Sequence, residues 1–436
     1  MDLSNVPLRR PALWAGLLIL LAGLLVDLHL TRKYGGADLR DKVIGSRSLL
    51  EGRSPYFEPW RPGDPERFAD PMVPPGSELT RFTGSPFQAL FMAPMAPVHF
   101  PTMRLLWTFL QYALLLLTVG LMYKAFGTSN KVHLITAFAV LAVIVSSGSW
   151  RLHVERGQIY VIYAVLIAGV FLAAHTRSHG TLGVLGAILV LSKPTYGLLL
   201  LPLVFHLTWR MLAGGAVTIM LALVPFLFLP DGFSSWAEYS EAMKIWGANP
   251  GKGAIPPPVA MDYTYPAVIE GASNLADHHT MEAENGSITT ILLTFGVGIP
   301  DVAPYVLTLL LIGIVLLPWW KQWRQLPATD LILLGSCFNT ILMMLLPVLR
   351  FHYQFVMWTA PILYVLLKIK EPRPEWTLGA IFAGLLVVGA LELLPINVLL
   401  AEMILLVLIA HYFRGKIRSA GRVTAGSSSS VLEHTY

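Results

Sequence analysis

Apolar runs long enough to cross a lipid bilayer recur along the chain, and they restrict its fold more than any other feature. A bilayer core about 30 Å thick needs about 20 apolar residues per helix. By that measure we expect an all-α polytopic membrane protein with about twelve transmembrane helices. The expected spans are near 12–30, 103–126, 132–149, 158–175, 180–192, 195–209, 211–230, 303–320, 327–347, 351–368, 376–394 and 396–413.

The composition agrees with a membrane fold. Of 436 residues, 55% are hydrophobic and 13% are charged, which is too apolar for a soluble globular domain. We find no motif for binding nucleic acid, and we expect no nucleic-acid partner. The single cysteine, Cys337, lies in an apolar run, which excludes an intrachain disulfide and predicts a buried, unreactive thiol.

Basic residues predict the orientation, because short cytoplasmic loops are enriched in Lys and Arg. With the N-terminus inside, four basic residues in short outer loops run against this rule: Arg151, Arg156, Lys193 and Arg350. The basic residues on the cytoplasmic side would be Arg9, Arg10, Lys124, Lys131, Arg177, Arg210, Lys321, Arg324, Lys368, Lys370, Arg373, Arg414, Lys416, Arg418 and Arg422.

We expect one transmembrane domain over residues 1–420, with two long extracytoplasmic loops at about 31–102 and 231–287 that carry short helices. Loops of this length are usually functional. Residues 421–436 are predicted to form a disordered cytoplasmic tail. The first apolar run lacks a cleavage site and predicts a retained helix.

Asp38 opens an amphipathic stretch just outside the first span. Leu39, Val43 and Leu50 could face the membrane while Asp38, Asp41 and Arg47 face water. Asp is a preferred helix N-cap, so Asp38 could be a cap. It could also be a general base, which requires an ionised carboxylate in a partly dry cavity. Local sequence leaves both interpretations open.

Residues 151–158 crowd several titratable side chains between the third and fourth spans. One interpretation is a solvated turn held by ion pairs. In the other, Gly157 allows close packing and Gln158 donates hydrogen bonds into a cavity, because a glutamine at membrane depth needs a partner. Both interpretations remain open.

The segment Ser192 to Tyr196 interrupts an apolar stretch, since Pro194 ends one helix before the next begins. Lys193 could extend its ammonium to the membrane surface or bind a phosphate. Arg350 is a second basic residue of this kind, in the short outer loop between the ninth and tenth spans. Two such cations on the outer side make an anionic lipid headgroup a plausible ligand.

The second outer loop closes with Asn285, Gly286 and Ser287, a sequence that fits a helix N-cap and also the short N-glycosylation motif. His278 and His279 precede it, but the known metal-binding patterns are missing around them. We therefore expect no metal site and no cofactor.

These motifs together resemble a known family over residues 12–365. In order they are Asp38, Gly52-x-x-Pro55-Tyr56, Gly157-Gln158, Lys193-Pro194, Asn285-x-Ser287 and an outer-loop histidine before a proline-containing helix. The combination resembles the GT-C membrane glycosyltransferases, and most closely the polyprenyl-phosphate-mannose-dependent alpha-mannosyltransferases of glycosyltransferase family 87.

The resemblance implies an inverting transferase in the bacterial plasma membrane. It would move a sugar, most readily mannose, from a polyprenyl-phosphate donor to a lipid-linked or cell-surface glycan acceptor at the extracytoplasmic face, with both termini cytoplasmic. Asp38 would be the base, and Lys193 and Arg350 would hold the donor phosphate. The residues implied for the sugar and acceptor pocket are Asp41, Tyr56, Glu155, Gln158, Asn285 and His352.

The sequence departs from the family pattern at two places. Gly84, Ser85 and Pro86 stand where such proteins often carry Tyr-Pro-Pro, and a single His352 replaces a histidine pair. Competing functions are a polyprenyl-lipid flippase or transporter, an O-antigen-type ligase or polymerase, and an assembly scaffold. A flippase would need polar residues on both sides of the midplane, whereas here the polar residues gather outside.

Overall fold

The computed structural model describes residues 9–34, 36–58, 64–70, 82–128, 131–248, 287–289, 292, 297–300, 302–318, 320–346, 352–368 and 397–429. Four residues singled out above, His278, His279, Asn285 and Arg350, lie outside these ranges, as does the expected span 376–394.

All regular structure in the described ranges is helical. The elements are α1 (Arg9–Tyr34), α2 (Ala37–Leu50), η2 (Glu66–Phe68), α3 (Pro86–Phe91), η3 (Ala93–Met95), α4 (Phe100–Phe126), α5 (Lys131–Ser146), α6 (Gly148–Arg156), α7 (Tyr160–His175), α8 (His179–Ser192), η4 (Pro194–Tyr196), α9 (Gly197–Leu200), η5 (Leu201–His206), α10 (Trp209–Leu223), η6 (Val224–Leu227), α11 (Ser234–Ala248), α14 (Ala303–Leu316), α15 (Trp320–Trp323), α16 (Ala328–Leu345), η8 (His352–Trp358), α17 (Thr359–Lys368) and α19 (Asn397–Ser429). The all-α prediction is confirmed for this part of the chain.

The expected count of about twelve spans is not confirmed. Among the described residues, four helices are long and apolar enough to cross a membrane, or five if the bent pair Val132–Ser146 and Gly148–Arg156 forms one span. The expected span 303–320 is shorter in the structure, where α14 has 14 residues. Helix α8, also of 14 residues, matches the short span expected at 180–192. After α8 the chain continues as the short pieces η4, α9 and η5, because prolines interrupt the helical hydrogen bonds.

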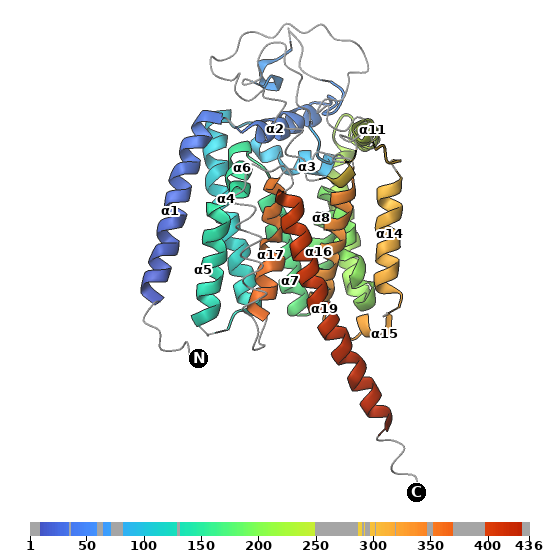
Figure 1. Cartoon of the computed structure of the whole chain (residues 1–436). Helices are drawn as coiled ribbons and strands as arrows, with labels where there is room; N and C mark the ends of the chain where they lie inside the picture. Colours follow the sequence, from blue (N-terminus) through green and yellow to red (C-terminus); the bar gives the residue numbers. More distant parts are fainter. Residues whose placement is uncertain are drawn as a thin grey trace.

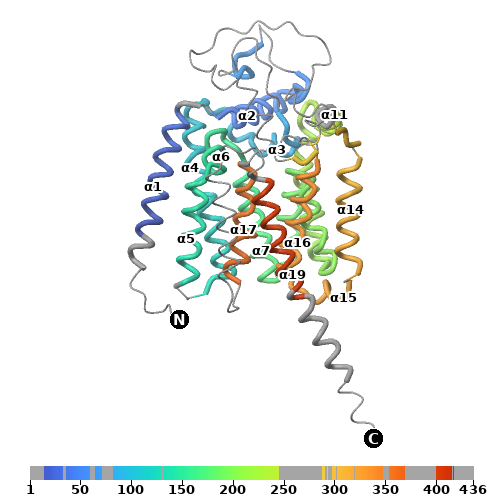
Figure 2. Tube along the Cα trace, viewed as in Figure 1, coloured from blue at the N-terminus to red at the C-terminus, as the bar shows by residue number. Residues whose placement is uncertain are grey.

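The long helices run side by side in one bundle (Figure 1). At one end, α2 lies across the bundle, and α3 and α11 lie beside it. At the opposite end, α1 begins and α19 ends. The trace in Figure 2 shows α6 rising to meet α2 at the first end, and these two helices are in contact. This end of the bundle therefore collects the first outer loop and the α6–α7 junction.

Packing separates a protein core from a lipid-facing periphery. Trp107, Trp150 and Phe171 are buried in the main core. In contrast, only 17% of the apolar window of α1 and 6% of that of the span Trp209–Leu227 are buried inside the protein. Lipid tails are as apolar as leucine, so such exposed apolar helices fit a membrane and not water.

The apolar side of α2 packs on protein, which corrects the expectation that it faces the membrane. Leu39 and Val43 are buried in the main core beside Trp107 and Val154, and only Leu50 of the three expected residues is exposed. The bundle beneath α2 offers an apolar surface that the amphipathic pattern alone could not reveal. Asp38, next to Leu39, is therefore held against the bundle.

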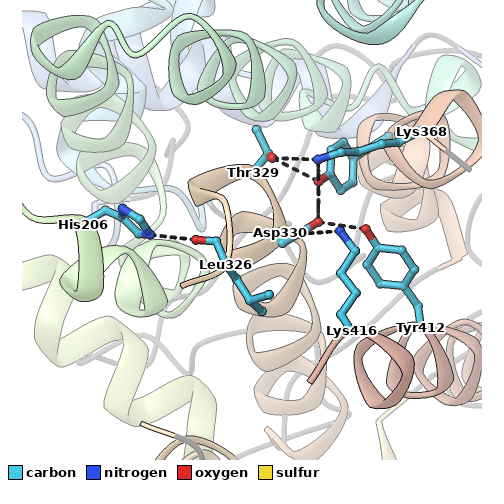
Figure 3. A network of polar contacts seen from close by, with 8 residues as sticks. His206, Leu326, Thr329, Asp330, Lys368, Tyr412 and Lys416 are labelled. Carbon is cyan, nitrogen blue, oxygen red and sulfur yellow. Dashed lines mark hydrogen bonds and ion pairs between the residues drawn. The ribbon is translucent and has the colours of Figure 1, made fainter. Parts of the chain in front are cut away.

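A buried carboxylate fixes α19 at the end of the bundle opposite α2 (Figure 3). Asp330, in the first turn of α16, is fully buried and accepts hydrogen bonds from Tyr364 on α17 and from Tyr412 at 2.9 Å and Lys416 at 2.7 Å on α19. Lys368 lies 4.0 Å from the same carboxylate. Three helices thus meet at one charged group. The helix α19 continues to Ser429, so residues 421–429, expected to be disordered, are helical.

Candidate active site

Asp38 is not the cap of its helix. The N-cap of α2 is Gly36, in the left-handed conformation (φ 70°), and no side chain caps this end. The Asp38 carboxylate is half-buried, and its Oδ2 accepts a hydrogen bond of 2.6 Å from Nε2 of Gln158. Of the two interpretations of Asp38, the structure removes the capping one. The carboxylate is directed at the junction between α6 and α7.

Gln158 is placed by the way α6 ends. Gly157 adopts φ 69°, its N–H donates to the carbonyl of Val154, and the N–H of Gln158 donates to the carbonyl of His153 at 2.9 Å. This is the hydrogen-bond pattern of a Schellman C-cap, which glycine favours. Gln158 is only 3% exposed, and its own carbonyl accepts from Nε2 of Gln111 at 3.0 Å. Residues 151–158 therefore do not form a solvated turn.

Lys193 reaches the same junction from α8. This helix ends at Ser192, as predicted from Pro194, and Lys193 is extended. Its Nζ donates to the hydroxyl of Tyr160 at 3.4 Å and lies 5.0 Å from the centre of that ring. Tyr160 begins α7, two residues after Gln158. Asp38 and Lys193 are thus both bonded to the short stretch 158–160.

Ser85 holds the first outer loop onto α8. Its hydroxyl caps α3 by accepting from the N–H of Gln88, and it donates to the carbonyl of Leu191 at 2.6 Å, with the carbonyl of Ser192 at 3.2 Å. These carbonyls immediately precede Lys193. The departure from the family pattern at residues 84–86 therefore has a structural role that sequence reasoning missed. The serine before a proline was the available N-cap signal.

Lys42 lies one turn after Asp38 on α2. Its ammonium donates to the backbone carbonyl of Asp38 at 2.9 Å. Burial lowers the pKa of Lys42, while the carboxylates of Asp38 and Asp41 act in the opposite direction. Asp41 and Glu155 are both half-buried. They add acidic groups around the predicted base.

Tyr56 lies in a separate apolar cluster with Phe82. It is 1% exposed, its hydroxyl donates to the carbonyl of Gly84 at 2.8 Å, and burial raises its pKa. The preceding turn needs Gly52, which has φ 69° and whose Cβ would lie 2.6 Å from Pro230. Tyr56 thus supports the loop next to Ser85, and it does not join Asp38 and Gln158.

Of the remaining predicted residues, His352 lies in the described part of the chain, whereas Asn285 and Arg350 do not. His352 begins η8, which packs against α6 and α7, and the ring of Tyr353 lies 5.5 Å from that of Tyr160. Ser287 is buried, and its hydroxyl donates to the carbonyl of Leu346 at the end of α16 at 2.5 Å.

Two small cavities, each of about 10 Å³, lie elsewhere in the bundle. One is between α17 and α19, and the other is at the bend between α5 and α6. Neither is lined by Asp38 or Lys193. Within the described ranges, no three His, Cys, Asp or Glu side chains are grouped closely enough to hold a metal ion. Cys337 is buried and free, as predicted.

Comparison with protein families gives a match to glycosyltransferase family 87 over residues 82–347. This is well over half of the chain. The chain belongs to glycosyltransferase family 87. The resemblance drawn from the motifs is confirmed. No curated protein and no solved structure matches the chain.

Membership of family 87 makes this protein a membrane glycosyltransferase, with a sugar donor and an acceptor as its substrates. The matched segment contains Ser85, Gln158 and Lys193, whereas Asp38 precedes it. The hydrogen bond from Gln158 therefore joins residues 82–347, which match the family, to the predicted base Asp38.

Proposed function

We propose that this family 87 glycosyltransferase moves a sugar, most readily mannose, from a polyprenyl-phosphate donor to a lipid-linked or cell-surface glycan acceptor. The observation that carries the proposal is the arrangement around residues 158–160. Gln158 binds the carboxylate of Asp38, and Tyr160 binds the ammonium of Lys193. Asp38, which can accept a proton, and Lys193, which can bind a phosphate, thus both contact the segment 158–160.

In the proposed reaction, Asp38 accepts the proton of the acceptor hydroxyl as its oxygen attacks the anomeric carbon. The new glycosidic bond forms while the bond from that carbon to the phosphate oxygen breaks, with inversion, and polyprenyl phosphate leaves. Lys193 and Arg350 stabilise the charge that develops on the departing phosphate. The amide of Gln158 holds Asp38 in its acceptor orientation.

Recognition of the sugar and the acceptor is proposed for Asp41, Glu155, Gln158, Asn285 and His352. Asp41 shares a helix with the base, and Glu155 lies at the end of α6. Tyr56 is proposed to contribute indirectly, because its hydroxyl supports the backbone beside Ser85. The carboxylates suit the hydroxyl-rich surface of a sugar, which offers many donors.

The proposed location of the reaction is the extracytoplasmic face of the bacterial plasma membrane. The helices around Asp38 lie at the end of the bundle opposite the start of α1 and the end of α19 (Figure 1). The lysines at that opposite end, Lys368 and Lys416, belong to the basic set expected in the cytoplasm. Both termini would then be cytoplasmic.

The test is transfer of labelled mannose from polyprenyl-phosphate mannose to a membrane lipid extract by the purified full-length protein. We expect Asp38→Asn to lose about a hundredfold or more of the rate, since general-base catalysis is worth about 10²–10⁴. The matched control is Glu241→Gln, an exposed carboxylate on α11, which should keep the parental rate. An Asp38→Asn protein as fast as the parent would show that the base lies elsewhere.

The same material distinguishes the competing flippase function. In liposomes, a flippase would move labelled polyprenyl lipid between leaflets without forming a glycosidic bond. Lipid movement with no sugar transfer would therefore overturn the proposal. A polymerase or ligase would require a pyrophosphate-linked donor and would leave polyprenyl-phosphate mannose unchanged.

A further inference from the structure

The guanidinium of Arg104 is enclosed where α2, α4 and α6 meet. Arg104 lies in the first turns of α4 and is 4% exposed. Its Nη1 donates to the carbonyl of Val154 at 2.8 Å, and its Nη2 donates to the carbonyl of Glu155. These carbonyls belong to the last turn of α6, where helix carbonyls lack partners within the helix. One planar side chain therefore binds the end of α6 at two points.

Two left-handed glycines bring backbone close to this guanidinium. A Cβ added to Gly36 would lie 2.7 Å from Nη1 of Arg104, and a Cβ added to Gly157 would lie 2.9 Å from the same atom. Gly36 is the N-cap of α2 and Gly157 ends α6. The start of α2 and the end of α6 thus both lie close to Nη1 of Arg104.

The two glycines stand next to the residues that form the proposed site. Gly36 lies two residues before Asp38, and Gly157 directly precedes Gln158. Gly157 also faces α2 itself, since its added Cβ would lie 2.7 Å from Cβ of Leu39. A shift of either backbone by 1 Å would lengthen the bond between Asp38 and Gln158 beyond hydrogen-bond range.

We propose that Arg104 is a positioning residue, which clamps the start of α2 to the end of α6 and so holds Asp38 against Gln158. The inference rests on the proposed role of Asp38 as the base. Arg104 does not bond directly to Gln158 in this arrangement; it binds the backbone carbonyls of Val154 and Glu155, and its charge attracts Asp38. A lysine cannot replace it, because one ammonium does not reproduce the two parallel bonds of a guanidinium.

Arg104 also acts through charge, since it attracts the carboxylates of Asp38 and Glu155. The other charged groups that act on Arg104 are Arg40 on α2 and Asp27 on α1. Asp38 and Asp41 in turn attract the ammonium of Lys42 on α2.

The experiment compares Arg104→Lys and Arg104→Gln with Arg47→Lys in the purified full-length protein. Arg47 is a matched control on α2, since its guanidinium also donates to backbone carbonyls, those of Ala96 and Val98. We expect Arg104→Lys to lower kcat by about tenfold to a hundredfold with KM for polyprenyl-phosphate mannose within about twofold. Arg47→Lys should lower thermal stability and leave kcat near the parental value.

The two Arg104 variants should differ in degree. Arg104→Gln is shorter and neutral, so it should lower kcat at least as much as Arg104→Lys, with KM again within about twofold. A merely structural role would alter the amount of folded protein and leave kcat per folded molecule unchanged. Equal loss of kcat in Arg47→Lys and Arg104→Lys would overturn the positioning role.

Amide hydrogen exchange provides a readout that needs no substrate. Arg104→Lys should speed exchange in residues 153–160 at the end of α6, and Asp38→Asn should not. Parental exchange in Arg104→Lys would show that no clamp exists. If exchange rises in Arg104→Lys but Asp38→Asn transfers sugar at the parental rate, the clamp stands and the assignment of the base fails.

Discussion

Gln158 donates a hydrogen bond of 2.6 Å to Asp38 across 120 residues of sequence. The donor directly follows Gly157, the C-cap of α6, and the acceptor lies in the first turn of α2. Asp38 therefore has a fixed orientation relative to the α6–α7 junction.

Replacing Gln158 should weaken catalysis more than folding. A hydrogen bond to a charged group is worth about 1.5–3 kcal/mol, so Gln158→Leu should lower kcat/KM by about tenfold to a hundredfold. Gln158→Glu keeps the shape but places a second carboxylate beside Asp38, which should move the acidic limb of the rate profile to higher pH. Initial rates across pH measure both effects. Rates equal to the parent for Gln158→Leu would show that this bond does not serve the reaction.

Lys193 should act on the donor phosphate. Lys193→Met should raise KM for the polyprenyl-phosphate donor by about tenfold or more and weaken inhibition by the product polyprenyl phosphate, because a charge-assisted bond is lost. Tyr160→Phe is the control, since it keeps the ring under Lys193 and removes only the hydroxyl bonded at 3.4 Å. It should change KM by less than about threefold. Unchanged product inhibition in Lys193→Met would place the phosphate elsewhere.

Ser85 should couple loop stability to donor binding. Ser85→Ala removes the cap of α3 and the bond to Leu191, which should cost about 1–2 kcal/mol of stability. The loosened backbone before Lys193 should also raise KM for the donor. Ser235→Ala is the control. It removes the hydrogen bond from the buried hydroxyl of Ser235, in the first turn of α11, to the carbonyl of Gly232. Thermal melts and KM for the donor are measured on both variants. Equal KM values in Ser85→Ala and Ser235→Ala would show that Ser85 does not support donor binding.

Asp330 should matter for stability and not for the reaction. Asp330→Asn leaves Lys416, Tyr412 and Lys368 around a neutral group. The expected loss is roughly 1.5–3 kcal/mol of stability, with kcat unchanged at a temperature where the protein stays folded. Protease cleavage of α19 should become faster. A fall in kcat without loss of stability would connect this end of the bundle to the site.

Glu238 on α11 should make the stability of the protein depend on pH. Burial raises the pKa of Glu238 above its ordinary value of 4.5, against the hydrogen bond from Ser54. A folded pKa above the unfolded one gives stability that is complete below 4.5 and is lost as pH rises through the folded pKa. Glu238→Gln should remove this part of the dependence. Melting temperatures between about pH 4 and pH 8 test it, with Glu241→Gln as the exposed control, whose slope should match the parent.

The elements of the site differ in how well the sequence predicted them. The break between α8 and η4 followed directly from Pro194, because proline cannot continue the hydrogen bonds of a helix. Close packing at Gly157 was one of two interpretations that the sequence left open, and the structure supports it. Asp38 remained undecided because an aspartate near a helix start fits a cap, and only the left-handed Gly36 shows that the cap is another residue. The sequence did not reveal the contacts made by Ser85 and Arg104, since each acts on backbone carbonyls about 50 to 107 residues away.

The sequence by itself determined the medium, the helical class and the family. Lipid solvates apolar side chains without regard to their order, so the length of the apolar runs was sufficient for the medium and the helical class. The family followed from the order and spacing of the short motifs. The tertiary structure decided which polar atoms meet. At the end of the bundle that holds α2, Gln158 pairs with Asp38 and Tyr160 with Lys193 because α2, α6, α7 and α8 are brought together there. A hydrogen bond depends on positions correct to a few tenths of an ångström, and those positions follow from packing between helices distant in sequence.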